Sequence, residues 1–284
     1  MSADPTRAPD TGTPPGHAPA PFADVLCALD GSRGSREAVK KAIALAAPGA
    51  ELLFIAVSQA SGTGLTEVAE LGESRAQEAL DDAAREAREA GVSASVELRK
   101  EGPTSDVLLS EAESHDLLVL GSSGVSRAGG IMLGSTATQA AHRTSVPLLV
   151  ARAGPDESSF PERILLASDG SPGSWAAARA TSRIARAFSS AVEVVHVPRD
   201  TDPERRRTLG EQVDAIREVS GVEPLLSDAT GRVAEVIADA ARADHSTLVA
   251  IGHRGVRGIR ALGSVSERVV HEAPCSVLVV PPVD

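Results

Sequence analysis

Residues 23–39 read ADVLCALDGSRGSREAV, and residues 162–178 read ERILLASDGSPGSWAAA. In each stretch a short apolar run ends at Asp-Gly-Ser-x-Gly-Ser and is followed by an Ala-rich segment. A short apolar run bounded by Gly indicates a buried strand, and an Ala-rich segment favours a helix. Both halves of the chain are therefore expected to begin with the same strand–turn–helix unit.

Two further pairs of segments recur in the same order. Residues 116–124 (DLLVLGSSG) are similar to residues 246–255 (STLVAIGHRG), and residues 145–152 (SVPLLVAR) are similar to residues 274–281 (PCSVLVVP). Similar segments that recur in one order at a long spacing indicate a duplicated structural unit. The chain is therefore interpreted as two copies of one unit.

The expected domain boundaries follow from this repeat. The 284 residues suffice for two domains of ordinary size. We expect the domains at residues 22–153 and 162–284, joined by a linker at residues 154–161 that is rich in Gly, Pro, Asp and Ser. Residues 1–21 contain few apolar residues and are predicted to form a disordered tail.

Alternating strand-like and helix-like segments decide the fold class. In the first copy, strands are expected at residues 25–29, 51–57, 92–98, 117–120 and 146–151, and helices at residues 35–47, 66–90, 104–114 and 135–143. In the second copy, strands are expected at residues 164–167, 192–197, 222–226, 248–251 and 277–280, and helices at residues 174–188, 203–219, 233–243 and 265–271. Apolar strands that alternate with helices form a parallel sheet covered on both faces. The prediction is an α/β protein with two tandem, doubly wound, five-stranded parallel-sheet domains.

The composition narrows the class of ligand. The chain has a net charge of −11, four Phe, one Trp and no Tyr. The negative charge disfavours nucleic acid and anionic membranes, and the scarcity of aromatic residues disfavours base stacking. Cys27 and Cys275 lie in apolar runs and are expected to be buried, reduced thiols. Because no long apolar segment or signal peptide is evident, the protein is predicted to be cytoplasmic.

The first copy carries a Gly-rich loop between a predicted strand and a predicted helix. It reads Gly121-Ser-Ser-Gly124, then nine residues, then Gly134-Ser135-Thr136. A Gly after a strand allows a positive φ and the close approach of a ligand, and a helix that starts with Gly-Ser-Thr presents free N–H groups to an anion. The loop is therefore predicted to hold phosphate groups. The alternative is a plain connecting loop in which Ser135 only caps the helix.

These features together resemble the universal stress protein family. The resemblance rests on the Asp that ends the first strand, the G-x2-G-x9-G-S loop, and the tail GSVSERVVHEAPCSVLVVP at residues 263–281, and it covers residues 22–152 and 161–282. It implies a five-stranded parallel fold of the adenine nucleotide alpha hydrolase type, with ATP as the ligand. It also implies that a tandem chain mimics the family's usual dimer, with its last strands, residues 146–151 and 277–280, paired.

The same resemblance assigns nucleotide-binding residues by position. In the first copy, Ala28 and Asp30 would contact the adenine–ribose end, Val57 would line the base pocket, and Leu120, Gly121, Gly124, Gly134, Ser135 and Thr136 would line the phosphate and ribose side. The matching second-copy residues are Ala167, Asp169, Val197, Ile251, Gly252, Gly255, Gly263, Ser264 and Val265. Asp30 and Asp169 also admit a second interpretation, because an Asp before Gly-Ser caps the following turn.

The second loop departs from the family pattern. Seven residues, and not nine, separate Gly255 from Gly263, and Arg254, Arg257 and Arg260 lie in this region. These arginines either pair with phosphate or form a solvated face. We therefore expect ATP to bind more tightly in the first copy.

Other residues give weaker indications. The seven His lack the spacing of metal ligands, so no metal site is predicted, although Mg²⁺ could accompany ATP. His253 either contacts a phosphate or is solvated, and His196 is expected to be structural. Arg205, Arg206 and Arg207 begin a predicted helix, and the sequence gives little support for a binding role there.

The sequence thus predicts an ATP-binding universal stress protein with a regulatory or sensing role in stress and little or no catalysis. No P-loop, Rossmann or hydrolase motif occurs, and no general base or phosphate-clamping Lys is evident, so any ATP hydrolysis is expected to be slow. Two alternatives stay open: a nucleotide-free interaction scaffold of the same fold, and a slow ATPase or phosphotransferase. The two domains are expected to pair within the chain, and a homodimer of chains is a further alternative.

Overall fold

The computed structural model describes residues 20–46, 49–58, 66–122, 133–154, 159–198, 203–253 and 262–282. The elements of the first half are β1 (Asp24–Leu29), α1 (Arg33–Ala46), β2 (Glu51–Val57), α2 (Thr66–Glu89), β3 (Ala94–Arg99), α3 (Thr104–Ala112), β4 (Leu117–Gly121), α4 (Ser135–Arg143) and β5 (Leu148–Ala151). Those of the second half are β6 (Arg163–Ala167), α5 (Pro172–Phe188), β7 (Ala191–His196), α6 (Pro203–Ser220), β8 (Leu225–Asp228), α7 (Val233–Ala243), β9 (Leu248–Gly252), α8 (Ser264–Glu272) and β10 (Ser276–Val280).

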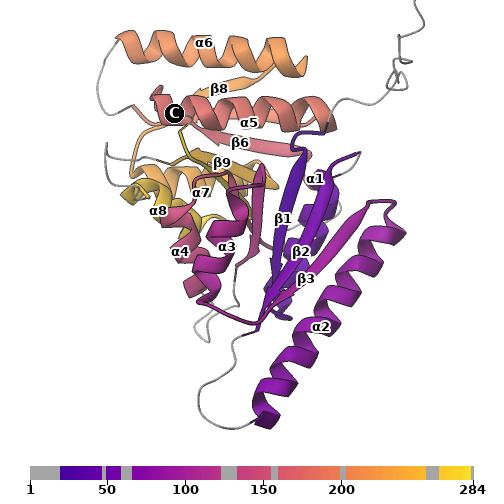
Figure 1. The fold of residues 1–284 in the computed structure, drawn as a ribbon. Coiled ribbons are helices and arrows are strands. Elements are labelled where there is room, and N and C mark those ends of the chain that lie inside the picture. Colours follow the sequence, from indigo (N-terminus) through magenta and orange to yellow (C-terminus); the bar gives the residue numbers. More distant parts are fainter. Residues whose placement is uncertain are drawn as a thin grey trace, which may run out of the picture.

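Within the described residues, the strands form one continuous ten-stranded sheet with the order β3-β2-β1-β4-β5-β10-β9-β6-β7-β8 (Figure 1). Strands within each half are parallel to one another, whereas β5 and β10 pair antiparallel where the halves meet. The predicted α/β class, with five parallel strands in each half, is confirmed. The two five-stranded sheets are joined edge to edge into a single sheet.

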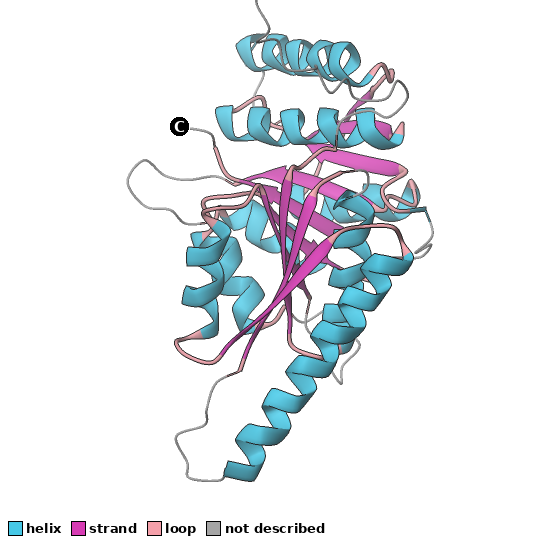
Figure 2. Ribbon diagram, turned by 45° about the vertical axis from the view of Figure 1, so that its right-hand side comes forward, coloured by secondary structure: helices cyan, strands magenta, loops and turns pink. Residues whose placement is uncertain are grey.

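Helices cover both faces of this sheet (Figure 2). Helices α1, α2, α5 and α6 pack on one face, and α3, α4, α7 and α8 pack on the other. Because both faces are covered, a central strand such as β4 is apolar at successive positions, and its residues Leu117, Leu118 and Val119 are fully buried. This packing explains the continuous apolar runs in the sequence. Among the described helices, none has the length and apolar character needed to cross a membrane.

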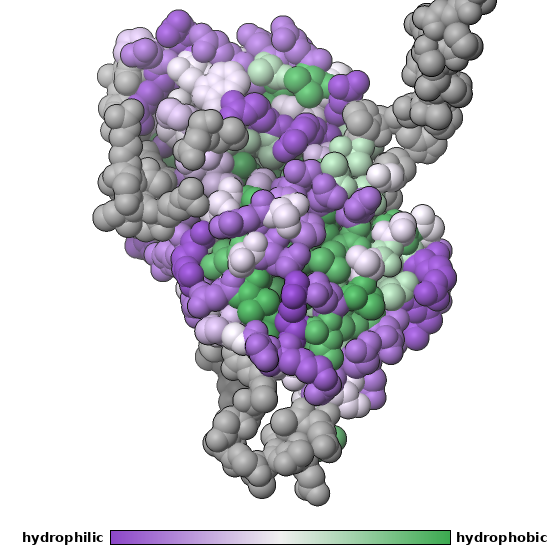
Figure 3. Space-filling view, viewed as in Figure 1, coloured by the Kyte–Doolittle hydropathy of each residue, from purple (hydrophilic) through white to green (hydrophobic). Residues whose placement is uncertain are grey.

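One part of the sheet surface is covered less completely. In the space-filling view, hydrophobic residues gather over the strands of the first half, beside α3 and between hydrophilic borders (Figure 3). Val96 of the edge strand β3 is 41% exposed, and Leu225 of the opposite edge strand β8 is 63% exposed. The outer strands of both halves are therefore less buried than the central ones.

Three strands begin later than the sequence predicts: the one expected at residues 92–98 begins at Ala94, and the other two have a visible local cause. The strand expected at residues 146–151 begins at Leu148, because Pro147 has no N–H and the Val146 N–H donates to the Thr144 hydroxyl (3.2 Å). The strand expected at residues 222–226 begins at Leu225, after Gly221 ends α6 with a φ of +73°. In both places a backbone N–H that a longer strand would have donated to its neighbour donates to a side-chain hydroxyl of the preceding turn instead.

The state of the two cysteines is the one that the sequence predicts. Cys27 and Cys275 are free and buried. Burial raises the pKa of both thiols, that of Cys275 to about 12, so both are protonated at neutral pH. They act as small apolar side chains of the core.

Two aromatic contacts cross the junction between the halves in a reciprocal way. Phe22, just before β1, lies against Arg183 of α5, with 5.4 Å between the guanidinium carbon and the ring centroid. Phe160, just before β6, lies against Lys41 of α1, with 4.6 Å between the ammonium nitrogen and the ring centroid. Such cation–π contacts contribute about 0.5–2 kcal/mol each, depending on burial.

Arg152 provides a second link between the halves. It follows β5 directly and is 4% exposed. Its guanidinium donates to the carbonyls of Ala273 (3.0 Å) and Val270 at the C-terminal end of α8, and its backbone N–H donates to the Ser276 hydroxyl (3.1 Å). Burial lowers the pKa of Arg152 to about 10, so the side chain stays charged at neutral pH. A cation at a helix C-terminus is stabilised by the helix dipole, and here it comes from the other half.

Arg152→Ala is expected to lower the free energy of unfolding by about 2–4 kcal/mol, because the Val270 and Ala273 carbonyls lose a buried donor. The measurement is urea unfolding followed by circular dichroism. The matched control is Arg143→Ala, whose guanidinium pairs with Asp106 at the surface and should cost less than about 1 kcal/mol. Equal losses for the two variants would contradict a structural role for Arg152.

Candidate functional site

The sheet order places a crevice in each half. In the first half β1 and β4 are neighbours, and their following helices α1 and α4 pack on opposite faces of the sheet. In the second half β6 and β9 are neighbours in the same way. Ligands of such sheets bind at the carboxyl ends of strands where the strand order changes direction. The structure therefore brings the predicted strand-end residues of each half to such a switch point.

Register confirms that these residues lie together. Ala28 of β1 is opposite Leu120 of β4, and Ala167 of β6 is opposite Ile251 of β9. Asp30 and Asp169 follow the first strand of each pair. The residues that the sequence placed at the adenine–ribose end and at the phosphate side are therefore neighbours on adjacent strand ends.

Both Asp residues organise the turn that follows them. The Ser32 N–H donates to Asp30 Oδ1 (2.9 Å), and the Ser171 N–H donates to Asp169 Oδ1 (3.1 Å). In the second half the Ser171 hydroxyl then accepts from the Ser174 N–H (3.3 Å) and caps α5. The turn-capping interpretation of the two Asp residues is thus correct for one carboxylate oxygen in each half.

Gly252 is required for a different reason from the one that the sequence suggested. Neither Gly121 nor Gly252 has a positive φ. A Cβ atom on Gly252 would lie 2.5 Å from the Gly173 carbonyl carbon, and a Cβ atom on Gly121 would collide with the backbone of Gly34 in the same way. Each Gly therefore allows the strand end to pack directly against the first turn of α1 or α5.

The helices that follow the Gly-rich loops begin without a side-chain cap. Gly134 and Gly263 are the N-cap residues of α4 and α8, and neither helix has a capping hydrogen bond from a side chain. Ser135 therefore does not cap α4, because it lies in the first turn. The plain connecting loop stays an alternative, since residues 123–132 lie outside the described residues. Free N–H groups at a helix start, with the positive end of the dipole, suit an anion.

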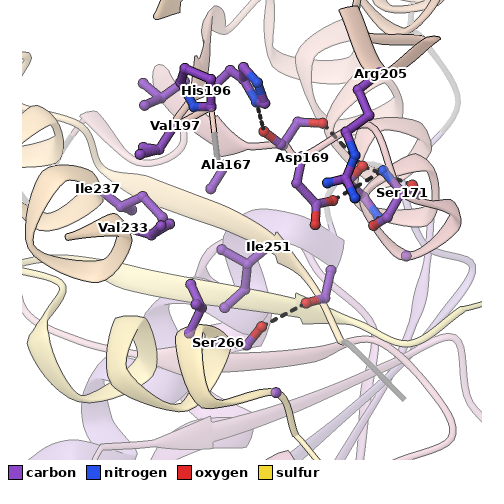
Figure 4. Close-up of a pocket in the computed structure, with 18 of the residues that line it drawn as sticks. Ala167, Asp169, Ser171, His196, Val197, Arg205, Val233, Ile237, Ile251 and Ser266 are labelled. Atoms are coloured by element: carbon purple, nitrogen blue, oxygen red, sulfur yellow. Dashed lines mark hydrogen bonds between the residues drawn. The ribbon is translucent and has the colours of Figure 1, made fainter. Parts of the chain in front are cut away.

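A cavity of about 500 Å³ occupies the crevice of the second half (Figure 4). Predicted residues line it at eight positions, namely Ala167, Asp169, Val197, Ile251, Gly252, Gly263, Ser264 and Val265. The ninth predicted residue of this half, Gly255, lies outside the described residues, as do Arg254, Arg257 and Arg260. All the predicted second-half residues that the structure describes therefore share one cavity.

The cavity has an apolar side and a polar side. Figure 4 shows Val197, Val233, Ile237 and Ile251 on one side and Asp169, Ser171 and Arg205 on the other. Val233 and Ile237 come from α7 and are one turn apart on its inner face. The apolar side offers a slot for a flat base, and the polar side offers partners for hydroxyl or phosphate groups.

Sequence reasoning missed several of these residues. It gave no role to Val233 and Ile237, and it found little support for binding by Arg205 and Arg206, yet all four line the cavity. The spacing of Val233 and Ile237 indicates a buried helix face without naming what that face covers. The three consecutive Arg at the start of a predicted helix were the one sequence feature that could have indicated positive charge beside this cavity.

A network of buried hydrogen bonds lies behind the polar side of the cavity. The His196 Nδ1–H donates to the Ser168 carbonyl (2.9 Å), the Ser168 hydroxyl donates to the Gln212 side-chain oxygen (2.5 Å), and the Gln212 amide donates to the Ser174 hydroxyl (3.0 Å). Gln212 is fully buried. The network fixes α6 against the turn that carries Asp169, and it confirms a structural role for His196, which also lines the cavity.

His253 is neither solvated nor among the residues that line the cavity. It is 3% exposed, and its Nε2 has no hydrogen-bond partner within the described part of the chain. Burial lowers its pKa, against a smaller opposing effect of the Ala141 and His142 carbonyls at the end of α4. His253 therefore faces the other half of the molecule, close to where His142 approaches Glu267 (3.7 Å).

The first-half site is described in part. Ala28, Asp30, Leu120 and Gly121 lie at the ends of β1 and β4, Val57 ends β2, and Gly134, Ser135 and Thr136 begin α4. Gly124 lies outside the described residues. Among the described residues of both halves, no three His, Cys, Asp or Glu side chains gather as metal ligands.

Comparison with known proteins identifies the class and then the family. The fold of this chain is similar to that of a solved universal stress protein from Archaeoglobus fulgidus, with a TM-score of 0.78, 22% identity, and coverage of 92% of this chain and 99% of that one. The model of the universal stress protein family matches residues 21–152 and 161–281. This chain belongs to the universal stress protein family.

Two further relatives show the range of similarity. A universal stress protein of Mycolicibacterium smegmatis is 29% identical over 249 residues, which are 80% of this chain and 84% of that protein. A universal stress protein solved in complex with cAMP is 21% identical, with a TM-score of 0.36, over 43% of this chain and 98% of its own. The cAMP in that complex is a ligand of that protein.

Gly252→Ala should lower the free energy of unfolding by about 1–3 kcal/mol, because the added methyl group meets the Gly173 backbone and one of the two segments must move. The measurement is thermal and urea unfolding. Gly210→Ala is the matched control, because this α6 position has open space for a Cβ atom, and the change should raise stability by up to about 1 kcal/mol. A neutral Gly252→Ala variant would show that close packing there is dispensable.

Acidification should destabilise the protein partly through His253. Because its folded pKa lies below the value of 6.5 for an unfolded His, the unfolded chain takes up the proton first as the pH falls. The stability is therefore present above about pH 6.5 and is lost as the pH falls toward the folded pKa, by at most about 1.4 kcal/mol per pH unit. His253→Gln should flatten the melting temperature between pH 7.5 and 5.5, and an unchanged slope would refute this assignment.

Proposed function

We propose that this universal stress protein binds ATP and acts in the cytoplasm as a regulatory or sensing protein in stress. The observation that carries the proposal is the second-half cavity, where the eight described residues assigned to nucleotide binding lie together. Its volume of about 500 Å³ is in the range of small-molecule sites.

The residues that line this cavity fit an adenine nucleotide. The apolar side chains of Val197, Val233 and Ile251 suit the base, and Asp169 suits a ribose hydroxyl. The uncapped start of α8 at Ser264 suits the phosphates, and the Ser266 hydroxyl holds that helix to the Gly252 carbonyl at the end of β9 (2.9 Å). The first half repeats the same plan with Asp30 and the uncapped start of α4.

The proposal includes little or no catalysis. The titratable residues that line the second-half cavity are Asp169, His196, Arg205 and Arg206. Asp169 Oδ1 already accepts a hydrogen bond from the Ser171 N–H, and His196 Nδ1–H already donates one to the Ser168 carbonyl. Mg²⁺ would be held chiefly by the phosphates of ATP, and Asp169 is the one carboxylate among the residues that line this cavity.

The first experiment is direct identification of the ligand. The purified protein is denatured, and the released small molecules are identified by absorbance and mass. An adenine nucleotide supports the proposal, whereas a protein that neither carries nor binds any nucleotide in calorimetry is the nucleotide-free scaffold. Sustained release of phosphate from ATP and Mg²⁺ at enzyme-like rates would instead favour the ATPase alternative.

Two variants locate the sites. Gly134→Val and Gly263→Val place a side chain at the start of α4 or α8, and neither strains the backbone, because the φ angles are −66° and −67°. Each should weaken ATP binding in its own half by about tenfold or more, since it obstructs the N–H groups. Calorimetric titration should also show the tighter site in the first half, as the loop spacing predicts. Gly210→Ala serves as the control, and two variants that both bind as the wild type would refute the proposed sites.

A further inference from the structure

A residue of the first half holds one end of the helix at which the second half is proposed to bind phosphate. Arg152 follows β5 and donates to the Ala273 carbonyl (3.0 Å) and to the Val270 carbonyl at the C-terminal end of α8. The opposite end of α8, after Gly263, is the uncapped start. Because α8 has nine residues, and so short a helix has little stability of its own, its placement depends in part on the contacts at its two ends.

The same segment is hydrogen-bonded to the Gly-rich loop of the first half. Ser122, which follows Gly121 at the end of β4, donates its N–H to the carbonyl of Ala151 (3.0 Å), the residue directly before Arg152. The backbone N–H of Arg152 then donates to the Ser276 hydroxyl of the second half (3.1 Å). A continuous series of contacts therefore runs from the first-half loop, through Ala151 and Arg152, to the end of α8.

A second series of contacts runs in the opposite direction. His253, which follows Gly252 in the second-half loop, donates its N–H to the Val280 carbonyl of β10 (2.7 Å). Its side chain is 3% exposed and lies against the Ala141 and His142 carbonyls at the end of α4. The uncapped start of α4 is the proposed phosphate site of the first half. Each loop is therefore connected to the far end of the helix that serves the other loop.

Contacts at both ends of α8 favour the same placement of this helix. A phosphate at its start and the guanidinium of Arg152 at its end both interact favourably with the helix dipole. His142 at the end of α4 also approaches Glu267 in the first turn of α8, with 3.7 Å between Nε2 and Oε1. A ligand that fixes one helix therefore also favours the contacts on which the other site depends.

We infer that the two nucleotide sites are coupled, so that filling the first-half site tightens the second-half site, and that Arg152 is the positioning residue that transmits this effect. The inference rests on the proposed function, because it requires that both halves bind a nucleotide. By linkage, filling the second-half site tightens the first-half site by the same factor. Couplings between sites typically change an affinity by about fivefold or more.

The test measures the second-half site with the first-half site filled and empty. In a calorimetric titration of nucleotide-free wild-type protein with ATP, the second-half site is the weaker of two steps, and it is assigned by its loss in Gly263→Val. Gly134→Val obstructs the first-half site, so the second-half site is then titrated alone. Its dissociation constant should be about fivefold or more larger in Gly134→Val than in the wild type.

Arg152→Lys should remove this difference. Lysine keeps the positive charge but lacks the planar fork that holds two carbonyls, so the end of α8 loses its fixed connection to Ala151. When both proteins carry Arg152→Lys, the second-half dissociation constants with and without Gly134→Val should agree within about twofold. If Arg152 only stabilised the fold, its loss would weaken both proteins equally and leave their ratio unchanged.

Arg163→Lys is the matched control. Arg163 also binds the end of a helix, since its Nε–H donates to the carbonyl of Asp244 (2.7 Å), the C-cap residue of α7, but both residues belong to the second half. This variant should keep the full difference between wild type and Gly134→Val. Circular dichroism shows whether each variant is folded, and if Arg152→Lys is not, the comparison of wild type with Gly134→Val still decides whether the sites are coupled.

Three results would overturn the inference. The second-half site could bind ATP equally or more tightly in Gly134→Val, the difference could persist in Arg152→Lys, or ATP could bind in the first half alone. In each of these cases the proposed function survives, because ATP still binds. If ATP binds in neither half, the proposed function fails together with the inference, which distinguishes that outcome from the other three.

Discussion

The antiparallel pairing of β5 with β10 is the contact on which the rest of this structure depends. Leu149 and Leu278 face each other in this pair, and both are fully buried. An unpaired edge strand would expose its N–H and C=O groups together with an apolar surface. The pairing satisfies both edges at once, and it converts two five-stranded sheets into one sheet of ten strands.

This pairing also makes each half complete the other. Arg152 of the first half holds the end of α8, and His253 of the second half lies against the end of α4. These are the two helices whose starts are proposed to hold phosphate. A short helix is fixed when its C-terminal carbonyls have partners, so the position of each proposed phosphate site depends on residues from the opposite half.

The two crevices share a backbone plan but not a set of side chains. Both have an Asp that caps a turn, a pair of Gly residues in close contact, and an uncapped helix start. Near these shared features, the second half replaces the apolar Leu29 with Ser168, which joins α6 to the turn through Gln212. Duplication therefore preserved what the backbone needs, while polar residues beneath and beside the second cavity changed its chemistry.

The sequence by itself determined the duplication, the α/β class, and the strand-end Asp and Gly residues, because these depend on local patterns of apolar runs and turns. The strand starts at Leu148 and Leu225 came later than predicted, because a local turn competes there with the strand for backbone groups. Only the tertiary structure decided what Gly121 and Gly252 do, because their close neighbours, Gly34 and Gly173, are distant in sequence. The same holds for Arg205, Val233 and Ile237, which reach one cavity from different helices. Sequence periodicity shows which face of a helix is apolar, but the packing of the sheet decides what that face meets.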